Sequence, residues 1–244
     1  MMTLVLLPGL DGTEVLFAPL LRSLPAWIRP VVIEYPDMGM NSYEELIEFV
    51  DKEVSSLDNF AILGWSFGGP LALMIAARRP SQVSAVVLCA TFVTPPSPTL
   101  ARLRPIVSTP VYAVVRALRR IRYVIPGFAS SELRRAKAVL WRRLSPRMLA
   151  ARARAALSVD ARDLLKACRA PLMYLASSHD ATVPRANREI VTAIAPQTQV
   201  FEVVGAHHSL FTKPVESVAY LVQFLGQFQC QTMMVEADAA APAP

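Results

Sequence analysis

The chain has 244 residues, of which 53% are hydrophobic and 18% charged, and its formal net charge is +6. This length and apolar content predict one globular domain with a large buried core and argue against a disordered protein. No apolar run approaches the roughly 18 residues that a membrane span needs. Three scattered cysteines and three histidines offer neither a disulfide framework nor a metal cluster. We therefore expect a cytoplasmic protein with no integral membrane segment, no metal and no organic cofactor.

The first third of the chain alternates apolar strands with helices. Strands are predicted at residues 3–9, 29–36, 60–65 and 83–92, and helices at residues 14–24, 41–57 and 67–79. Ser42 and Glu45 have the spacing of a capping box at the start of the second helix. Such alternation predicts a mostly parallel sheet with helices on both faces.

This alternation stops after residue 92 and resumes at residue 170. A proline-rich turn and an arginine-rich segment that favours helices fill residues 93–169, which we interpret as an insertion in a core formed by residues 1–92 and 170–230. Further strands are predicted at residues 170–177 and 199–204, with helices at 185–195 and 215–228, which gives about six strands in all. The small, acidic tail at 231–244 is expected to be disordered.

The charge is concentrated in this insertion. Between Ala101 and Ala170 there are 15 arginines and 2 lysines against three acidic residues, a local net charge of +14 that leaves −8 for the remainder. The asymmetry indicates either a solvated surface or a docking site for an anionic partner. Nucleic acid is the least favoured partner, because no recognisable nucleic-acid-binding module is present.

The sequence "GWSFG", Gly64–Gly68, lies where a predicted strand becomes a predicted helix. A tight turn there would present the Ser66 hydroxyl above the sheet, and the flanking glycines avoid collisions between strand and helix. The N-terminus of the helix would also favour developing negative charge. We interpret Ser66 as a nucleophile, the alternative being a turn serine that is merely flanked by glycine.

A nucleophilic serine needs a base that is oriented by an acid. Asp180 follows the predicted strand at 170–177, and both His207 and His208 follow the last predicted strand. These loops fall at the carboxyl ends of parallel strands, the edge at which such sheets bind ligands. The Ser66 turn lies at the same edge.

Four segments, in this order, resemble those of the α/β-hydrolase family over nearly the whole chain: "LLPGLDGT", "GWSFGG", "SSHDATVP" and "GAHHSLFTKP". The resemblance implies an α/β-hydrolase fold in which the insertion forms a helical cap over the nucleophile. It implies Ser66 as the nucleophile and Asp180, which fits D-x-x-V-P, as the acid. Counting G-x-x-H from Gly205 makes His208 the base and His207 its competitor.

The same resemblance implies an oxyanion hole formed by the backbone N–H groups of Leu10 and Phe67. Asp11, beside Leu10, is expected to face solvent or to hold its own loop. The chain departs from common family patterns in having Pro8-Gly9 where His-Gly is frequent, and in lacking the usual N-terminal hairpin. These departures argue against assigning the properties of any one subfamily to this chain.

These residues predict a serine hydrolase that cleaves a small-molecule carboxylic ester through an acyl-enzyme. An alternative is an esterase or thioesterase for acyl chains on acyl carrier protein or coenzyme A, since pimeloyl-acyl-carrier-protein methyl ester esterases are similar and have a basic cap. Haloperoxidase-like and C–C bond hydrolases use the same triad. A non-catalytic binder of this fold is a further alternative from a different class.

Overall fold

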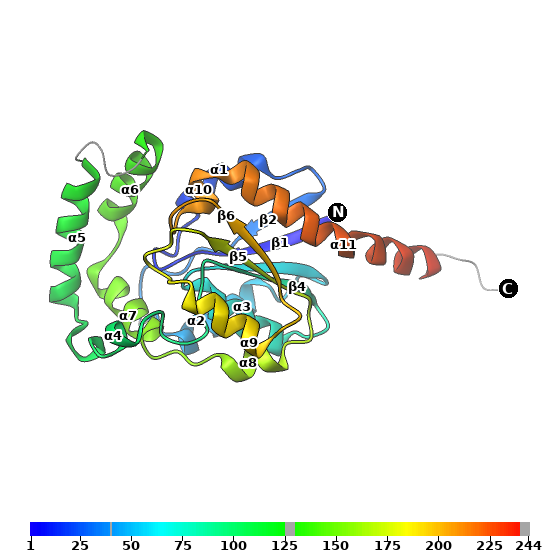
Figure 1. The fold of residues 1–244 in the computed structure, drawn as a ribbon, viewed down its shortest axis with the longest axis horizontal. Coiled ribbons are helices and arrows are strands. Elements are labelled where there is room, and N and C mark those ends of the chain that lie inside the picture. Colours follow the sequence, from blue (N-terminus) through cyan, green and yellow to red (C-terminus); the bar gives the residue numbers. More distant parts are fainter. Residues whose placement is uncertain (40, 125–129, 240–244) are drawn as a thin grey trace.

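The computed structural model describes residues 1–39, 41–124 and 130–239, and its centre is one parallel sheet (Figure 1). The strands are β1 (Met2–Leu7), β2 (Ile28–Val32), β3 (Phe60–Trp65), β4 (Val83–Cys89), β5 (Leu172–Ser177) and β6 (Gln199–Val203). They pair in the order β2-β1-β3-β4-β5-β6, and every pair is parallel. The predicted six-stranded, mostly parallel sheet is therefore confirmed.

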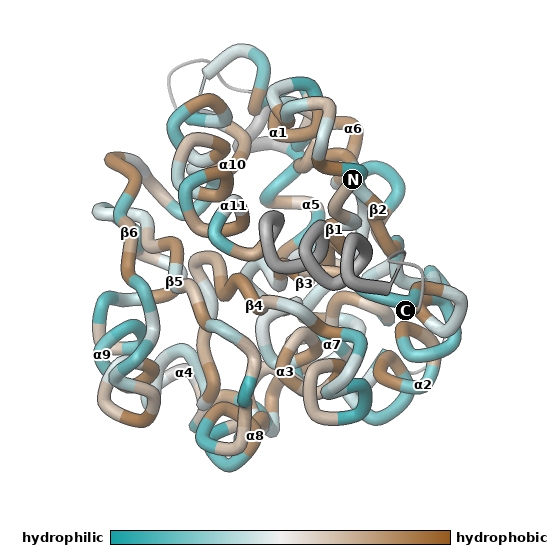
Figure 2. Tube along the Cα trace, turned by 90° about the vertical axis from the view of Figure 1, so that its right-hand side faces the viewer, coloured by the Kyte–Doolittle hydropathy of each residue, from teal (hydrophilic) through white to brown (hydrophobic). Residues whose placement is uncertain are grey.

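Helices cover both faces of the sheet, as Figure 2 shows along its edge. One face carries α1 (Ala18–Ser23), α10 (Ser209–Thr212) and α11 (Pro214–Ala239), and the other carries α2 (Tyr43–Glu53), α3 (Gly68–Arg78), α8 (Arg162–Ala167) and α9 (Ala186–Ile194). Each face has its own buried apolar cluster, because the strands are apolar on both sides. The predicted helices on both faces are thus observed.

Local signals in the sequence account for several helix ends. Ser42 Oγ accepts from the Glu45 N–H, and the Glu45 carboxylate accepts from the Ser42 N–H, so the predicted capping box is present. The predicted helix at 14–24 is instead a 3₁₀ turn, η1 (Glu14–Leu16), followed by α1. Pro19 lies in the first turn of α1, where its missing N–H costs no hydrogen bond.

Within the described part of the insertion, every secondary-structure element is a helix or a 3₁₀ turn, joined by short irregular segments. It contains α4 (Pro98–Ala101), a 3₁₀ turn η2 (Arg104–Ile106), α5 (Thr109–Val124), α6 (Ser131–Arg143), α7 (Pro146–Ala156) and α8. Helices α5, α6 and α7 lie beyond one end of the sheet (Figure 1), whereas α8 returns to pack against α3 and α9. The part of the insertion that stands off the sheet is therefore α5–α7.

The C-terminal segment differs from its prediction. Helix α11 continues past the expected end at Phe228 to Ala239, so most of the segment expected to be disordered is helical. The sequence from residue 227 to 239 holds neither proline nor glycine, which permits this continuation. The rest of the predicted tail, residues 240–244, lies outside the described residues. No helix in the described part of the chain is long and apolar enough to cross a membrane.

The strand order determines where a site can form. The chain leaves β1 toward β2 on one side and returns to β3 on the other, so the loops after β1 and β3 diverge at a topological switch point. The loop after β1 contains Leu10, and the turn after β3 contains Ser66. The two segments that the sequence singled out are therefore brought together at the carboxyl edge of the sheet.

Candidate active site

Ser66 occupies a strained turn between β3 and α3. Its φ is +53°, a left-handed conformation that costs a non-glycine residue about 1–3 kcal/mol. The Ser66 N–H donates to the Cys89 carbonyl (2.9 Å), and the Thr91 hydroxyl donates to the Ser66 carbonyl. These bonds hold the turn, so the predicted strand-turn-helix geometry around Ser66 is observed.

The glycines beside Ser66 permit close packing. A Cβ on Gly68 would lie 2.6 Å from the Leu7 carbonyl oxygen and 2.8 Å from that of Pro8, and a Cβ on Gly64 would lie 2.6 Å from the Cα of Gly69. Any side chain at these positions would force the strand, the helix and the first loop apart. The glycines therefore bring the loop after β1 directly against the turn.

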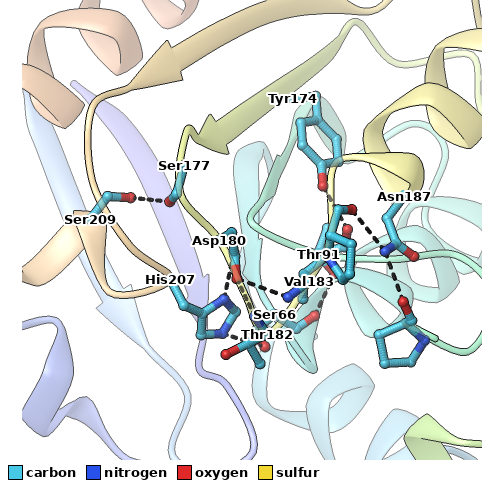
Figure 3. Close-up of polar contacts among 12 residues, drawn as sticks. Ser66, Thr91, Tyr174, Ser177, Asp180, Thr182, Val183, Asn187, His207 and Ser209 are labelled. Atoms are coloured by element: carbon cyan, nitrogen blue, oxygen red, sulfur yellow. Dashed lines mark hydrogen bonds and ion pairs between the residues drawn. The ribbon is translucent and has the colours of Figure 1, made fainter. Parts of the chain in front are cut away.

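His207 links Ser66 to Asp180 (Figure 3). Its Nε2 lies 3.0 Å from Ser66 Oγ, and its Nδ1 lies 2.7 Å from Asp180 Oδ2. Asp180 Oδ1 accepts from the backbone N–H groups of Thr182 and Val183, each at 2.8 Å. The carboxylate is thus fixed on one side by its own loop and directed at the imidazole on the other.

The expectation that His208 contacts Ser66 is wrong, because His207 occupies that position. The loop is anchored at one end by the Gly205 N–H, which donates to Ser178 Oγ (3.2 Å), and at the other by the hydroxyls of Ser209 and Ser177, 2.6 Å apart. His208 is the N-cap residue, directly before α10, and no hydrogen bond joins its ring to Ser66. The spacing from Gly205 is therefore G-x-H rather than the expected G-x-x-H.

His208 lines a cavity above Ser66 but makes no hydrogen bond to this serine. Its ring packs edge-on against Trp65 at 5.9 Å, and burial, followed by the positive charge of Lys137, lowers its pKa well below the usual range. It is accordingly neutral at physiological pH. His179 is exposed, and its Nδ1 lies 2.7 Å from Ser178 Oγ, as expected of a loop side chain.

The loop after β1 lies over the serine turn. Within the described residues, the backbone N–H groups of Leu10 and Phe67 donate to no other group, so both remain free to hydrogen bond to a substrate. The Tyr43 hydroxyl donates to the Phe67 carbonyl (3.0 Å), and burial raises the pKa of Tyr43 well above its usual range, which keeps it a donor. Asp11 accepts from the N–H and hydroxyl of Thr13, so it holds its own loop as expected.

Arg152 of α7 fastens this loop from the side of the insertion. Its guanidinium donates to the carbonyls of Leu10 (3.1 Å) and Asp11 (2.8 Å), to the Pro36 carbonyl (3.0 Å), and twice to Asn41 Oδ1. The side chain is fully buried. Arg152 is one of the 15 arginines of the insertion, and no local sequence pattern distinguishes a buried arginine there from an exposed one.

A cavity of about 200 Å³ opens above Ser66. Its walls come from the β1 loop, the serine turn, both histidines and the inserted helices: Gly9, Leu10, Asp11, Leu16, Trp65, Ser66, Tyr112, Val115, Arg119, Trp141, Thr182, His207 and His208. A larger depression of about 350 Å³ lies on the far side of Asp180, and its lining does not include Ser66. In the part of the chain that the structure describes, no cluster of three or more histidine, cysteine or acidic side chains could hold a metal ion.

The model of the alpha/beta hydrolase family matches residues 4–219. The chain belongs to this family. The match spans the sheet, the Ser66 turn, the inserted helices and the His207 loop of this α/β hydrolase, so the family resemblance drawn from the sequence is confirmed.

Individual relatives of this α/β hydrolase share only a minority of its residues. A pimeloyl-[acyl-carrier protein] methyl ester esterase of Xylella fastidiosa is 26% identical over 243 residues, covering 90% of this chain and 93% of that protein. Among solved structures, a thermophilic esterase from Thermogutta terrifontis aligns with a TM-score of 0.79 at 18% identity, covering 93% of this chain and 90% of that chain. A bromoperoxidase from Bacillus anthracis aligns with a TM-score of 0.78 at 18% identity, covering 92% of each chain. At such identities the structural likeness shows the fold alone.

Proposed function

We propose that this α/β hydrolase is a serine esterase that uses Ser66, His207 and Asp180. The observation that carries the proposal is the chain of contacts from Asp180 through His207 to Ser66 Oγ, with separations of 2.7 Å and 3.0 Å. Nucleophile, base and orienting acid within hydrogen-bond reach are the arrangement that acyl transfer requires. The base in this proposal is His207 in place of the His208 that the sequence favoured.

The reaction proceeds in two halves. His207 Nε2 takes the proton of Ser66 as its Oγ attacks the ester carbonyl, and the N–H groups of Leu10 and Phe67 stabilise the oxyanion. Collapse of the tetrahedral intermediate releases the alcohol, which receives the proton from His207, and leaves an acyl-enzyme. Water activated by His207 then releases the carboxylic acid, while Asp180 stabilises the imidazolium in both halves. This chemistry uses only side chains and backbone N–H groups of the chain itself, together with water.

A fluorophosphonate probe tests the proposal directly. Wild-type protein should be labelled stoichiometrically, and Ser66→Ala should not be labelled, because the probe forms a covalent bond only with an activated serine. Loss of labelling together with loss of hydrolysis of a short methyl ester would support the proposal and exclude a non-catalytic binder. Labelling that persists in Ser66→Ala would contradict it.

A second candidate is an esterase for acyl chains on an acidic carrier protein, and one surface favours it. Arg116 and Arg120 are used structurally, since they donate to backbone carbonyls at the end of α6. Four other arginines of α6 and α7 are exposed and unpaired among the described residues: Arg135, Arg142, Arg143 and Arg147. We name these four the α6–α7 arginines. Such a basic surface suits an acidic partner, and the Xylella relative is named for a carrier-bound ester.

This candidate is tested by comparing a methyl-ester acyl chain on acyl carrier protein with the same ester free in solution. A preference for the carrier form that falls with rising salt, and falls again when the α6–α7 arginines are changed to glutamine, would support carrier docking. Equal kcat/KM for the carrier-bound and the free ester would instead favour a small-molecule esterase. We expect either enzyme to act in the cytoplasm, where the free thiols of Cys89 and Cys168 remain reduced.

A further inference from the structure

The outward side of helix α5 carries no charge. Six exposed side chains share one side of this helix at 3.6 residues per turn, and all of them are apolar: Pro110, Val111, Ala113, Val114, Ala117 and Leu118. We name these six the α5 apolar face. Its three large members are exposed by 41%, 60% and 61%: Val111, Val114 and Leu118. A helix side that faces water normally carries polar and charged residues, so this side is unlike an ordinary solvated surface.

Two arginines of α5 turn toward the protein instead. Arg116 donates to the Leu144 carbonyl (2.7 Å), and Arg120 donates to the carbonyls of Trp141 and Arg142 (3.0 Å each). Both side chains therefore bind the C-terminal end of α6, while α5 packs against α6 and α7. The helix thus places these polar groups inward and its apolar side chains outward, the reverse of a solvated amphipathic helix.

The segment that leads into α5 exposes two more large apolar side chains. Leu103 and Ile106 are exposed by 46% and 60%. Among the described residues, five of the eleven large apolar side chains that are exposed therefore lie between residues 103 and 118. Single exposed apolar residues are normal, whereas a gathering of them indicates a surface that contacts a partner. Figure 1 shows α5 as the helix of the insertion farthest from the sheet, where a large partner can reach it.

The same part of the chain is basic and contains no acidic residue. No aspartate or glutamate occurs between Asp58 and Glu132. Arg102 and Arg104, in the segment before α5, are exposed and form no ion pair with any described residue. The surface therefore combines an uncharged apolar helix side with positive charge beside it in the sequence.

We propose that α5 lies on an anionic lipid surface, with the α5 apolar face at the boundary between headgroups and acyl chains and with Arg102 and Arg104 at the headgroup phosphates. Helices that combine an apolar face with basic residues bind membranes in this way without crossing them. Apolar side chains leave water on binding, and guanidinium groups donate charge-assisted hydrogen bonds to phosphate. This binding does not depend on the chemistry proposed for Ser66.

Two other occupants fit this surface less well. A second copy of the chain would bring together two segments, residues 101–170, that each carry a net charge of +14. An acidic protein would place carboxylates against six side chains that cannot hydrogen bond, and removing those charges from water without a partner is costly. The α6–α7 arginines suit such a protein better. A bilayer instead presents hydrocarbon directly beneath its anionic groups, which matches both parts of the surface.

The position of α5 also connects this surface to the candidate active site. Tyr112, Val115 and Arg119 of the same helix line the cavity above Ser66. A lipid surface in contact with the α5 apolar face would therefore lie roughly one helix diameter, about 10 Å, from this cavity. Such a placement suits an ester that partitions into lipid.

Vesicle binding tests the inference with the full chain carrying Ser66→Ala, so that no lipid is hydrolysed. Co-sedimentation is measured with vesicles of equal parts phosphatidylcholine and phosphatidylglycerol and with vesicles of phosphatidylcholine alone. We expect binding to the anionic vesicles to be stronger by about tenfold or more and to weaken with rising salt. No binding to the anionic vesicles, or equal binding to both kinds, would overturn the inference.

Variants of the apolar side chains locate the contact. Val114→Gln combined with Leu118→Gln should lower the partition coefficient by about tenfold or more, because two apolar side chains no longer leave water. Val204→Gln combined with Val215→Gln is the matched control, since these valines are 63% and 74% exposed and lie outside the insertion. The control should bind as Ser66→Ala alone does. Binding that the α5 double variant leaves unchanged would overturn the inference.

Variants of the arginines test the charge. Arg102→Gln and Arg104→Gln should each lower binding to the anionic vesicles by about fivefold and leave binding to phosphatidylcholine unchanged. If both leave anionic binding unchanged, the assignment of these arginines to the headgroups is overturned.

Two further measurements decide between occupants. Sedimentation velocity without lipid that showed a dimer, dissociated by Val114→Gln with Leu118→Gln, would assign the face to a second copy and overturn the inference. Loss of a preference for a carrier-bound ester in the same double variant, with vesicle binding retained, would assign the face to the carrier protein and also overturn it. Vesicle binding that depends on the α5 apolar face, found together with a wild type that fluorophosphonate does not label, would support the inference and count against the proposed function alone.

Discussion

Replacing Arg152 with methionine removes the link between α7 and the β1 loop. The change leaves four acceptors without a donor: the buried Asn41 Oδ1 and three partly buried backbone carbonyls. Each unpaired acceptor costs about 1–3 kcal/mol. Burial lowers the pKa of the arginine to about 10, and removing this disfavoured charge returns about 3 kcal/mol. With mid-range values, we expect the free energy of unfolding to fall by about 3–5 kcal/mol.

The same variant should impair catalysis more than binding. Two of the lost bonds fix the carbonyls of Leu10 and Asp11, and Leu10 supplies the proposed oxyanion N–H. Loss of one oxyanion donor lowers kcat by about 10²–10³-fold, which sets the upper limit of the effect. A lysine at this position should rescue only in part, because an ammonium cannot reproduce the guanidinium fork.

Urea unfolding and steady-state kinetics check both expectations, with rates normalised to fluorophosphonate-titrated sites so that unfolded protein does not count as inactive enzyme. The matched control is Arg154→Met on the same helix, an exposed arginine with one bond to the Val107 carbonyl (3.0 Å), which should cost less than about 0.5 kcal/mol. Unchanged stability and unchanged kcat in Arg152→Met would refute the role of this residue in positioning the loop.

Three further substitutions have definite expected outcomes. Burial lowers the pKa of Lys137 to about 8. Between pH 8 and 10.5 the unfolded chain therefore binds more protons than the folded chain. Because of this difference, the free energy of unfolding of the wild type rises with pH across that window. Lys137→Met should therefore be more stable than wild type by about 3 kcal/mol at pH 7 in urea unfolding, with the difference vanishing near pH 10.5; a constant difference would contradict this. Gly68→Ala should reduce kcat and thermal stability together, since its Cβ would lie 2.6 Å from the Leu7 carbonyl oxygen, and full activity would show that the contact relaxes freely. Asp180→Asn should lower kcat by about 10³–10⁴-fold with a normal unfolding curve, whereas a loss below tenfold would remove Asp180 from the triad.

Much of the fold could be predicted because the buried strands are continuous apolar runs with clear ends. β3 agrees with its predicted bounds, and the capping box of Ser42 and Glu45 marks the start of α2. The Ser66 turn could be predicted for the same reason, since glycine spacing and the change from strand to helix are local properties.

The features that escaped prediction depend on contacts distant in sequence. Two adjacent histidines are equivalent by composition, and His207 is distinguished from His208 by anchors that include the contact between Ser177 and Ser209 across the loop. Arg152 and Lys137 belong to an arginine-rich segment that indicates a solvated surface, yet both are buried. Their burial follows from the packing of α6 and α7 over the β1 loop, and no local sequence pattern predicts this packing.

The most direct test of the central claim compares His207→Ala with His208→Ala under identical conditions, using a short methyl ester and fluorophosphonate labelling. We predict that His207→Ala loses several orders of magnitude in kcat and labels very slowly, while His208→Ala retains activity within about tenfold, because only His207 lies within hydrogen-bond reach of both Ser66 and Asp180. Full activity in His207→Ala combined with an inactive His208→Ala would contradict the account and return the role of base to His208.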